Sequence, residues 1–364
     1  MENKPKTDKF EEILTNYQVT NQTLSELPPL PIEECNRFGY ERKMYDEDKV
    51  AYCDELNEQE IKRDQLRIQK FAVMKQLYET KHIFHKKMKD RVRKGLPHEV
   101  RKEFYEMILD HYKNSVSMDF LPNINELYHK NEVLPNDNQI DLDVKRTQCS
   151  HYLFNTNYVK GKRELFLLLR AISQIETELG YTQGMNDFGG LIFSVTHDKT
   201  ITLQLFHIIL NNPMYDMKEN VKDMFPGLKD YEKVHNLMMK HLHPNIWNHF
   251  MKLGYNDVPM PSFLFEWYMM WFCRILPVDM CYYVFDRMLF DGRKALFTAA
   301  HCLLTYLEED ILKETEIFLA IQIMKTPIEI VLRKLSGREF MNYCYKNKVT
   351  QKMINSWLSE ENSN

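Results

Sequence analysis

The sequence predicts an all-α protein, with a multi-helix domain that follows a largely irregular N-terminal segment. Apolar residues recur at spacings of three and four along most of the chain, and no stretch shows the alternation of a strand. The 364 residues include only 11 glycines, against 44% hydrophobic and 12% aromatic residues. That composition favours packed helices over a loop-rich fold. Proline and glycine stand mainly between the periodic runs, where helices end.

The N-terminal segment is predicted to span residues 1–58 and to be extended or disordered. It contains three closely spaced prolines and lacks sustained periodicity, and residues 1–60 hold 15 Asp or Glu against 7 Lys or Arg. Residues 59–364 are predicted to form the helical domain. Its first part reverses the charge balance, because residues 61–102 hold 14 Lys or Arg against 4 Asp or Glu.

The first helices of the domain are basic. A helical pattern covers Glu60 to Lys89, either as one long helix or with a break near Thr80. Pro97 suits the first turn of the next helix. The inner stripe of that helix is predicted at Val100, Phe104, Ile108 and His111. Residues 115–139 are predicted to be loops around one short helix near Ile124–Tyr128.

Two strongly apolar helices flank a short connection in the middle of the chain. Glu164–Glu178 is apolar on nearly every face, as expected for a helix surrounded by others. Gly180 suits a left-handed cap at its end, and Met185–Val195 is again largely apolar. Tyr181–Gly184 is therefore predicted to lie in a tight turn on a rigid scaffold, where a functional side chain is best held in position.

The remaining helices are separated by proline or glycine. They are predicted at Thr200–Leu210, Leu228–Leu242, Pro244–Leu253, Ser262–Ile275, Val278–Phe290, Arg293–Leu307 and in a last run ending near Leu358. The most apolar window, Phe263–Leu276, carries Glu266 and Arg274 and is shorter than the ~20 residues of a membrane-spanning helix. It is predicted to be a buried helix.

The opening residues and the cysteines favour the cytoplasm. Met1–Leu14 is polar and charged, unlike a signal peptide. The 7 cysteines are odd in number and form no C-x-x-C pair, so they are predicted to be reduced, with several in the core.

Metal and nucleotide sites of the chain's own are not expected. His82 with His85, and His241 with His243, lack the cysteines or carboxylates that would complete a zinc site. Lys160–Arg163 fails both ends of the phosphate-loop consensus. The net charge of −4 gives no general case for nucleic-acid binding.

The basic run from Lys81 to Arg101 is interpreted as a solvated helix face. Phosphates of RNA or of lipid are the alternative contacts for these side chains.

Arg146 and Gln183 are the candidate site residues. An arginine can cancel negative charge on a transferring phosphoryl group, and a glutamine amide can orient a water molecule beside it. Each also has a simpler explanation when taken alone. Arg146 stands three residues after Asp143, as in a helical ion pair, and Gln183 precedes a glycine, as in a turn.

Six motifs, taken together in chain order, favour a functional role for Arg146 and Gln183 over these simpler explanations. They are Arg93-x-Gly95-Leu96-Pro97-x-x-x-Arg101, Ile140-x-x-Asp143-x-x-Arg146-Thr147, Tyr181-x-Gln183-Gly184-Met185, Phe225-Pro226-Gly227-Leu228, Trp267 followed by Leu276-Pro277, and Phe285-Asp286-x-x-Leu289-Phe290-x-Gly292. Together they resemble the motifs of TBC domains, the activators of Rab-type small GTPases. The resemblance covers about residues 85–310.

The resemblance implies that Arg146 is an arginine finger and Gln183 a glutamine finger. Both would act in trans on a Rab-type GTPase in its GTP form, which itself binds the GTP and Mg²⁺, so the chain needs no cofactor. Asp143, Thr147, Tyr181 and Gly184 are the expected supporting residues. The chain would be an enzyme activator rather than a hydrolase with its own nucleotide site.

The same resemblance implies a role in vesicle trafficking. We expect a cytoplasmic protein, peripheral to endomembranes, whose membrane association is transient and made through the partner. No nucleic-acid partner is expected. A non-catalytic Rab-binding scaffold with the same fold is one alternative. A helical nucleic-acid adaptor built on the basic segment is another.

Three positions depart from the family pattern. Tyr105 and Phe285 stand where the family usually has tryptophan, and both are expected to keep an aromatic ring in the core. Gln148-Cys149 replaces the usual Phe-Pro after Arg146-Thr147. That change alters the shape beside Arg146 and bears on the choice of GTPase.

Overall fold

The computed structural model describes residues 29–41, 58–129, 132–155, 159–215, 217–222 and 225–361. Within these ranges the regular secondary structure is helical, and strand pairing is limited to the isolated bridges Cys35–Glu41 and Tyr40–His151. The all-α prediction is confirmed. No helix in the described part of the chain is long and apolar enough to span a bilayer.

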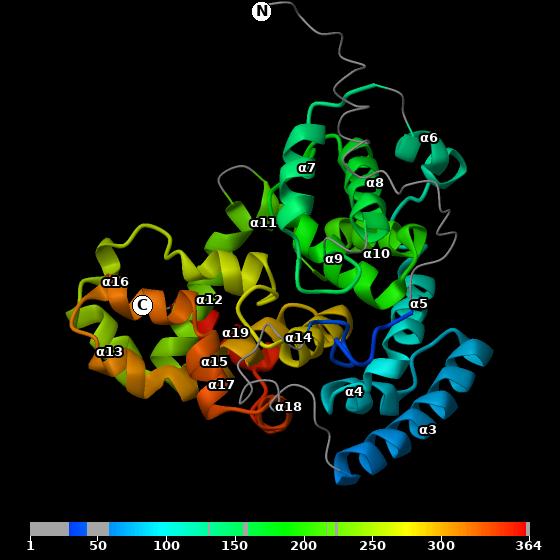
Figure 1. Cartoon of the computed structure of the whole chain (residues 1–364). Coiled ribbons are helices and arrows are strands. Elements are labelled where there is room, and N and C mark those ends of the chain that lie inside the picture. Colours follow the sequence, from blue (N-terminus) through cyan, green and yellow to red (C-terminus); the bar gives the residue numbers. More distant parts are fainter. Residues whose placement is uncertain are drawn as a thin grey trace, which may run out of the picture. The chain divides into compact units, whose positions relative to one another are not determined.

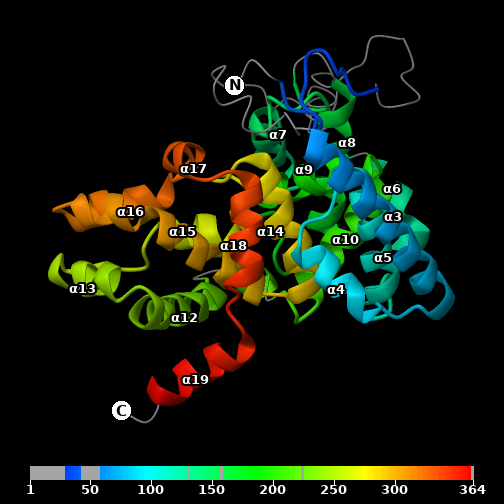
Figure 2. The ribbon, with the colours of Figure 1, turned by 90° about the horizontal axis from the view of Figure 1, so that it is seen from below.

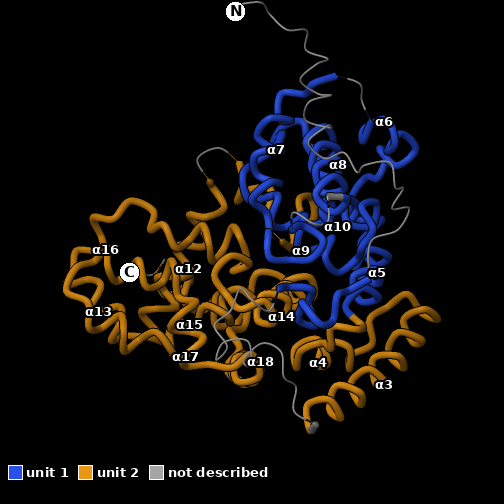
Figure 3. Tube along the Cα trace, in the orientation of Figure 1, with its two compact units in different colours: residues 1–50, 101–209 blue, residues 51–100, 210–364 orange. Residues whose placement is uncertain are grey.

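Two compact units make up the chain (Figure 3). Unit 1 contains residues 1–50 and 101–209, and unit 2 contains residues 51–100 and 210–364. Most of the proposed N-terminal segment, residues 1–28 and 42–57, lies outside the described residues. The boundary at residue 58 therefore stays a prediction.

Unit 1 is built around α8 (Figure 1). Its helices are α5 (Arg101–Tyr112), η3 (Leu121–Asn123), α6 (Ile124–His129), α7 (Asp137–Arg146), α8 (Val159–Ile175), α9 (Met185–Thr196) and most of α10 (Lys199–Asn211). α8 packs against α6, α7 and α9. Leu165, Phe166, Leu167, Leu168 and Leu169 are each at most 2% exposed, which confirms that this helix is surrounded.

The α5 stripe is shorter than predicted. Phe104 and Ile108 are fully buried, but His111 is exposed at the last turn of the helix. There its ring meets the edge of the Tyr112 ring, with the centroids 4.7 Å apart. The prediction of His111 in the inner stripe was therefore wrong.

Gly180 is left-handed, as predicted, but α8 ends at Ile175, so Gly180 lies in the connection to α9 and does not cap α8. Gly180 has φ +60° and Gly184, which precedes α9, has φ +109°. Both values lie in the region that favours glycine. Tyr181–Gly184 therefore occupies a turn fixed at both ends by buried helices.

Unit 2 begins with α3 (Glu58–Lys81) and α4 (Lys86–Arg93), followed by η2 (His98–Val100). The continuous helix to Lys89 was wrong, and the alternative with a break is confirmed, just beyond Thr80. His82 has φ +51° and ends α3. Phe84 anchors the turn, because its ring lies 4.8 Å from that of Tyr78 and 4.9 Å from that of Phe290.

The remainder of unit 2 surrounds α15, which packs against α13, α14, α16, α17 and α18 (Figure 2). Its elements are α11 (Met217–Val221), α12 (Pro226–Leu242), α13 (Pro244–Lys252), η4 (Tyr255–Asp257), η5 (Phe265–Met269), α14 (Val278–Asp291), α15 (Lys294–Lys313), α16 (Ile317–Lys325), α17 (Ile328–Lys334), α18 (Gly337–Lys346) and α19 (Gln351–Glu361). The helices predicted from Leu228 onward are confirmed except for one.

The exception is the helix expected over Ser262–Ile275. Phe265–Met269 forms a π-helical turn, and the following Trp271 and Phe272 have φ values of +45° and +64°. Trp267, Trp271 and Phe272 are all buried, and the Trp267 indole donates a hydrogen bond to the carbonyl oxygen of Met324 at 2.8 Å. Packing of these large rings overrides the regular helical backbone.

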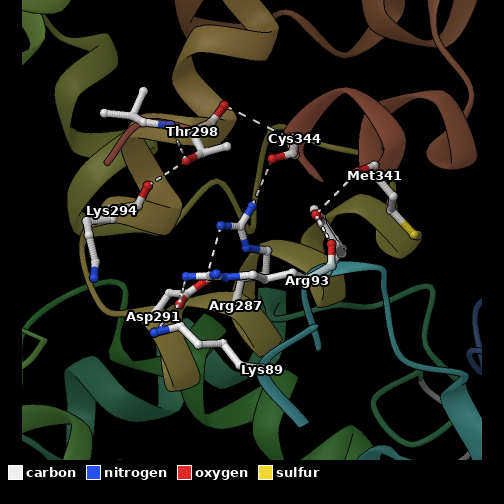
Figure 4. A network of polar contacts seen from close by, with 10 residues as sticks. Lys89, Arg93, Arg287, Asp291, Lys294, Thr298, Met341 and Cys344 are labelled. Carbon is white, nitrogen blue, oxygen red and sulfur yellow. Dashed lines mark hydrogen bonds and ion pairs between the residues drawn. The ribbon is translucent and has the colours of Figure 1, made fainter. Parts of the chain in front are cut away.

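An ion-pair cluster joins α4 to α14 within unit 2 (Figure 4). Asp291 accepts hydrogen bonds from Arg93 Nε at 2.8 Å, Arg93 Nη2 at 2.7 Å and Arg287 Nη2 at 3.2 Å. The Tyr283 hydroxyl donates to the carbonyl oxygen of Arg93 at 2.8 Å. Burial acts to raise the pKa of Asp291, but the hydrogen bonds and charges of the two arginines outweigh it and lower that pKa.

Candidate functional site

Helix α7 separates a buried face from an exposed one. Ile140, Asp143 and Val144 are buried, whereas Leu142 and Arg146 are exposed, and this spacing follows the helical repeat. Arg146 occupies the last turn, where the negative end of the helix dipole favours a cation. The sequence thus places the guanidinium at the surface and the carboxylate three residues before it inside.

A buried ion pair at the start of α7 fixes the helix in unit 1. Asp137 and Arg170 of α8 both have fully buried side chains, and Asp137 Oδ1 accepts from Arg170 Nε at 3.1 Å. The backbone N–H of Leu134 donates to Asp137 Oδ2 at 2.7 Å. Breaking such a pair would leave an uncompensated buried charge, so α7 has little freedom to shift against α8.

The Asp143 carboxylate is the centre of the site. Its Oδ1 accepts from Arg146 Nη2 at 2.6 Å, Arg146 Nε at 3.1 Å and Gln139 Nε2 at 3.2 Å. Its Oδ2 accepts from the Tyr181 hydroxyl at 2.8 Å. The Asp143 side chain is fully buried, while the Arg146 side chain remains 59% exposed. One carboxylate therefore orients an arginine that still faces solvent.

Tyr181 brings the α8–α9 connection to this carboxylate. Burial, the hydrogen bond to Asp143 and nearby negative charge together raise the pKa of the Tyr181 hydroxyl far above its usual value of 10. The phenol therefore stays protonated and donates to Asp143 at any physiological pH. This hydrogen bond joins the segment of Arg146 to the segment of Gln183, 38 residues apart in sequence at its two ends.

Gln183 lies two residues after Tyr181, in the turn before α9, and is exposed. Among the described residues, its side-chain amide makes no hydrogen bond. Both its donor and its acceptor atoms can therefore serve a docked molecule. The turn itself is held by Tyr181 on one side and by the first residues of α9 on the other.

Asn186 forms a second connection between the two segments. Its Nδ2 donates to Thr147 Oγ1 at 2.8 Å, and its Oδ1 accepts from the backbone N–H of Gly184 at 3.0 Å. Thr147 Oγ1 in turn donates to the carbonyl oxygen of Asp143 at 2.7 Å. The residues directly after Arg146 and Gln183 are thus joined through one buried amide. Sequence reasoning missed Asn186, although it directly follows the motif that ends at Met185.

Gln148 adds a third connection. Its Nε2 donates to the carbonyl oxygen of Asp187 at 3.4 Å, and its Oε1 accepts from the Tyr40 hydroxyl at 3.2 Å. Gln148 has φ +40°, so the chain turns sharply after Arg146-Thr147. The structure thus shows what stands where the family usually has Phe-Pro. Its bearing on the choice of GTPase stays a prediction.

Gly190 of α9 lets these segments approach closely. A Cβ atom built on Gly190 would lie 3.2 Å from Gln148 Nε2 and 3.2 Å from Thr147 Cγ2, a tighter contact than side chains normally make. The neighbouring atoms would have to move by a few tenths of an ångström. Glycine at this position therefore sets the distance between α9 and the end of α7.

All the predicted site residues lie in unit 1, and hydrogen bonds connect most of them. Asp143, Arg146, Thr147, Tyr181 and Gly184 belong to one network, whereas Gln183 extends from it without a hydrogen bond to the described part of the chain. A cation and an amide lie at the surface, and the buried residues of the network hold their segments in place. This arrangement suits recognition of an anionic oxygen-rich group such as a phosphate. In the described ranges, no group of three or more His, Cys, Asp or Glu residues could hold a metal ion.

The fold and this network define a helical domain that presents an arginine and a glutamine on a rigid base. A sequence profile of the Rab-GTPase-TBC domain matches residues 98–312, and the chain belongs to this family. The resemblance seen in the six motifs is confirmed. Tyr105 and Phe285 are 0% and 1% exposed, so both rings remain in the core, as expected.

Several known proteins are similar to the chain. TBC1 domain family member 2B of Mus musculus is 23% identical over 62% of this chain, and Growth hormone-regulated TBC protein 6 of Caenorhabditis elegans is 27% identical over 57%. The chain covers 23% and 58% of these two proteins, which is less than two thirds of either. The crystal structure of the Chlamydomonas flagellar RabGAP TBC domain aligns with a TM-score of 0.61 at 17% identity, over 80% of this chain and 98% of that one. This alignment shows a shared fold.

Proposed function

We propose that the chain is a GTPase-activating protein for a Rab-type GTPase in its GTP form. Arg146 is the arginine finger and Gln183 the glutamine finger. The observation that carries the proposal is the contrast between a fully buried Asp143 and the 59% exposed Arg146 that it orients. The buried carboxylate orients the guanidinium, while the remaining N–H donors of Arg146 stay exposed and can donate to a docked partner.

The chemistry needs little from this chain beyond position and charge. Gln183 accepts a hydrogen bond from the attacking water and donates one to a γ-phosphate oxygen, so the water oxygen faces phosphorus. The water oxygen forms a bond to phosphorus while the bond from phosphorus to the bridging oxygen breaks, the water's proton passes to a phosphate oxygen, and GDP and inorganic phosphate form. Arg146 neutralises the negative charge that builds on these oxygens. GTP and Mg²⁺ are held by the partner.

The buried residues act by positioning the two fingers. Asp143 fixes the plane of the Arg146 guanidinium, and Tyr181 links that carboxylate to the turn of Gln183. Thr147 and Gly184 are joined through Asn186 in the second connection. Preorganisation of this kind spares the complex the cost of ordering the fingers during the reaction.

The exposed face of α7 is the proposed docking surface for the GTPase. Its exposed residues are Asn138, Gln139, Leu142, Lys145 and Arg146. Leu142 lies one helical turn before Arg146 and is 59% exposed, so an apolar anchor stands beside the finger. A partner surface with an apolar patch beside its nucleotide would bury Leu142 while receiving Arg146.

Single-turnover hydrolysis on a panel of GTP-loaded Rab proteins tests the finger mechanism. Wild type should stimulate at least one Rab, and Arg146→Ala and Gln183→Ala should each remove most of that stimulation. Arg333→Ala is the matched control, because Arg333 is also an exposed arginine in the last turn of a helix. Equal stimulation by wild type and both finger variants would rule the mechanism out. Rab binding without acceleration by wild type would instead indicate a scaffold.

The docking role of Leu142 is tested separately by steady-state kinetics. Leu142→Ala should raise KM about tenfold with little change in kcat, because it removes binding made equally in ground and transition states. Leu319→Ala removes a leucine of similar exposure, 49%, from unit 2 and should change neither constant. An unchanged KM for Leu142→Ala would contradict docking at this face. The site of action, peripheral to endomembranes and in vesicle trafficking, is proposed from the family.

A further inference from the structure

The first two helices of unit 2 carry a surface whose exposed charges are almost all positive. Across residues 59–94, every one of which has a described side chain, a single acidic residue is exposed, Glu79, which pairs with Lys75 at 3.9 Å. The exposed basic residues of the same range are Lys62, Arg63, Lys70, Lys81, Lys86, Lys87 and Lys89. We call these seven side chains, with the exposed aliphatic residues among them, the basic face.

The aliphatic residues of the basic face are unusual for a solvated surface. Ile61, Leu66, Val73 and Ile83 are 45%, 52%, 53% and 68% exposed. They are four of the nine large hydrophobic residues that are exposed in the described part of the chain. Such residues are ordinary when scattered singly, but here three lie among basic residues on α3 and the fourth, Ile83, lies among lysines in the turn that follows it.

Helical spacing puts charge and aliphatic groups on the same side of α3. Arg63, Leu66, Lys70 and Val73 follow one another at intervals of three, four and three residues, so they share one side of the helix. Phe71, Met74 and Tyr78 of the same helix are buried and form an adjoining side.

Ile83 is held outward by a well-anchored turn. Phe84 stacks on Tyr78 with ring centroids 4.8 Å apart, and His85 Nδ1 accepts from the backbone N–H of Lys87 at 3.1 Å, which caps α4. Lys81, Lys86 and Lys87 surround the isoleucine in sequence. Its exposure is therefore a built feature of the turn between α3 and α4 (Figure 2).

We propose that the basic face binds the surface of an anionic phospholipid bilayer. Lysines attract acidic headgroups, and aliphatic side chains between them enter the boundary of headgroups and acyl chains. The contact is interfacial, since no described helix is able to span a bilayer. It belongs to unit 2, whereas the fingers belong to unit 1, so it does not depend on the proposed GTPase chemistry.

Lipid fits the basic face better than RNA does. Proteins that bind single-stranded RNA stack bases on exposed aromatic rings and favour arginine. The seven exposed basic residues include one arginine, Arg63. The nearby tyrosine and phenylalanine rings point elsewhere, because Tyr78 is buried and Phe84 packs between Tyr78 and Phe290. Exposed isoleucine and leucine add nothing to phosphate binding but add much to a membrane contact.

Vesicle sedimentation of the full chain tests the proposal. The chain should pellet with phosphatidylcholine vesicles that contain phosphatidylserine, much less with phosphatidylcholine alone, and much less in about 0.5 M salt, which screens the charges. A triple variant, Lys70→Glu with Lys81→Glu and Lys87→Glu, should lower the partition coefficient at least about tenfold. The matched control reverses three exposed lysines elsewhere in unit 2, Lys346, Lys348 and Lys352, and should change it less than about threefold.

A second pair of substitutions separates lipid from RNA. Leu66→Ser with Ile83→Ser should lower vesicle binding several-fold and leave any RNA binding unchanged. Wild-type binding that ignores phosphatidylserine, or equal losses in the two charge variants, would overturn the proposal. RNA binding that needs the lysines, together with vesicle binding that does not, would replace it. Circular dichroism checks the fold of each variant, and if the triple variant does not fold, Lys87→Glu alone must still weaken binding.

Discussion

Two buried aspartates in this protein each bind arginine through Nε and Nη2, yet they leave the arginine in different places. Asp143 of unit 1 holds Arg146, whose side chain is 59% exposed. Asp291 of unit 2 holds Arg93 and Arg287, whose side chains are 23% and 4% exposed. The same pairing of groups thus gives one network whose guanidinium group is mostly exposed and one whose two guanidinium groups are largely buried.

The other donors explain the difference. Asp291 is compensated by two guanidinium groups, which lowers its pKa and makes the cluster a structural tie between α4 and α14. Asp143 has one guanidinium and two neutral donors, Tyr181 and Gln139, which fill its remaining acceptor sites. Because these neutral groups satisfy the buried carboxylate, the arginine is needed less for burial. It can meet a partner's negative charge instead.

The largest expected effect is on catalysis through Arg146. Arg146→Lys keeps the charge but loses the planar donor fork, so GTPase stimulation should fall by ~10³-fold or more with the thermal midpoint unchanged. Arg93→Lys should do the reverse, with a stability loss of ~1 to 3 kcal/mol and normal stimulation per folded molecule. Stopped-flow phosphate release and thermal unfolding measure the two effects. A large loss of stability in Arg146→Lys would break the comparison.

The next effect is on folding stability. Asp291→Ala leaves Arg287 buried without its carboxylate and should cost ~3 to 5 kcal/mol in urea unfolding. Asp143→Ala should cost about half as much or less, since Arg146 can turn its charge to water. Equal losses of unfolding free energy in the two variants would mean that the exposure of the arginine does not determine how much the ion pair stabilises the fold.

The contribution of the Asp291 cluster to folding stability should also depend on pH. The folded-state pKa of Asp291 lies below its usual value of 3.8, so the unfolded chain takes up the proton first as pH falls. The stability that the carboxylate contributes is therefore fully present well above pH 3.8 and is lost as pH falls through the lower folded value. The stability gap between wild type and Asp291→Asn should be constant from pH 7 to about 5 and shrink below about 4. Urea unfolding across this range measures it.

The smallest effects come from the two tyrosines. Tyr181→Phe and Tyr283→Phe each remove one hydroxyl that donates at 2.8 Å, to Asp143 and to the Arg93 carbonyl respectively. Each should cost ~1 kcal/mol of stability. Only Tyr181→Phe should also slow GTPase stimulation, by less than about tenfold, because it loosens the base of the fingers. Slower stimulation in Tyr283→Phe would show that unit 2 also tunes the site.

The sequence motifs single out Arg146 and Gln183 as candidates, but they do not indicate the hydrogen bonds that connect the two segments. Arg146 and Gln183 stand in recognisable motifs, whereas the burial of Asp143 and the exposure of Leu142 came from the structure. The contact of Asn186 with Thr147 was not predictable, because it joins residues 39 apart and depends on how α9 packs beside α7. Side-chain hydrogen bonds of this kind leave no periodic signal in the sequence.

Prediction of the helices from the sequence has the same limit. Apolar spacing located most of the long helices, since burial of one face dictates that pattern, but it did not separate the short helices α16, α17 and α18. It failed at Ser262–Ile275, where aromatic packing replaced the α-helix by a π-turn and two left-handed residues. It also failed to fix the break after Lys81, which depends on Phe84 reaching Tyr78 and Phe290. Local preference yields to tertiary packing at both places.

Gly190 makes inactivation possible through a residue that has no chemistry of its own. Alanine there would add one methyl group, pressing on Thr147 and Gln148 just beyond the arginine. A genetic selection for loss of function would show whether these two side chains can move aside, because such a mutation spares every polar atom of the fingers, and a scan restricted to charged residues would overlook it.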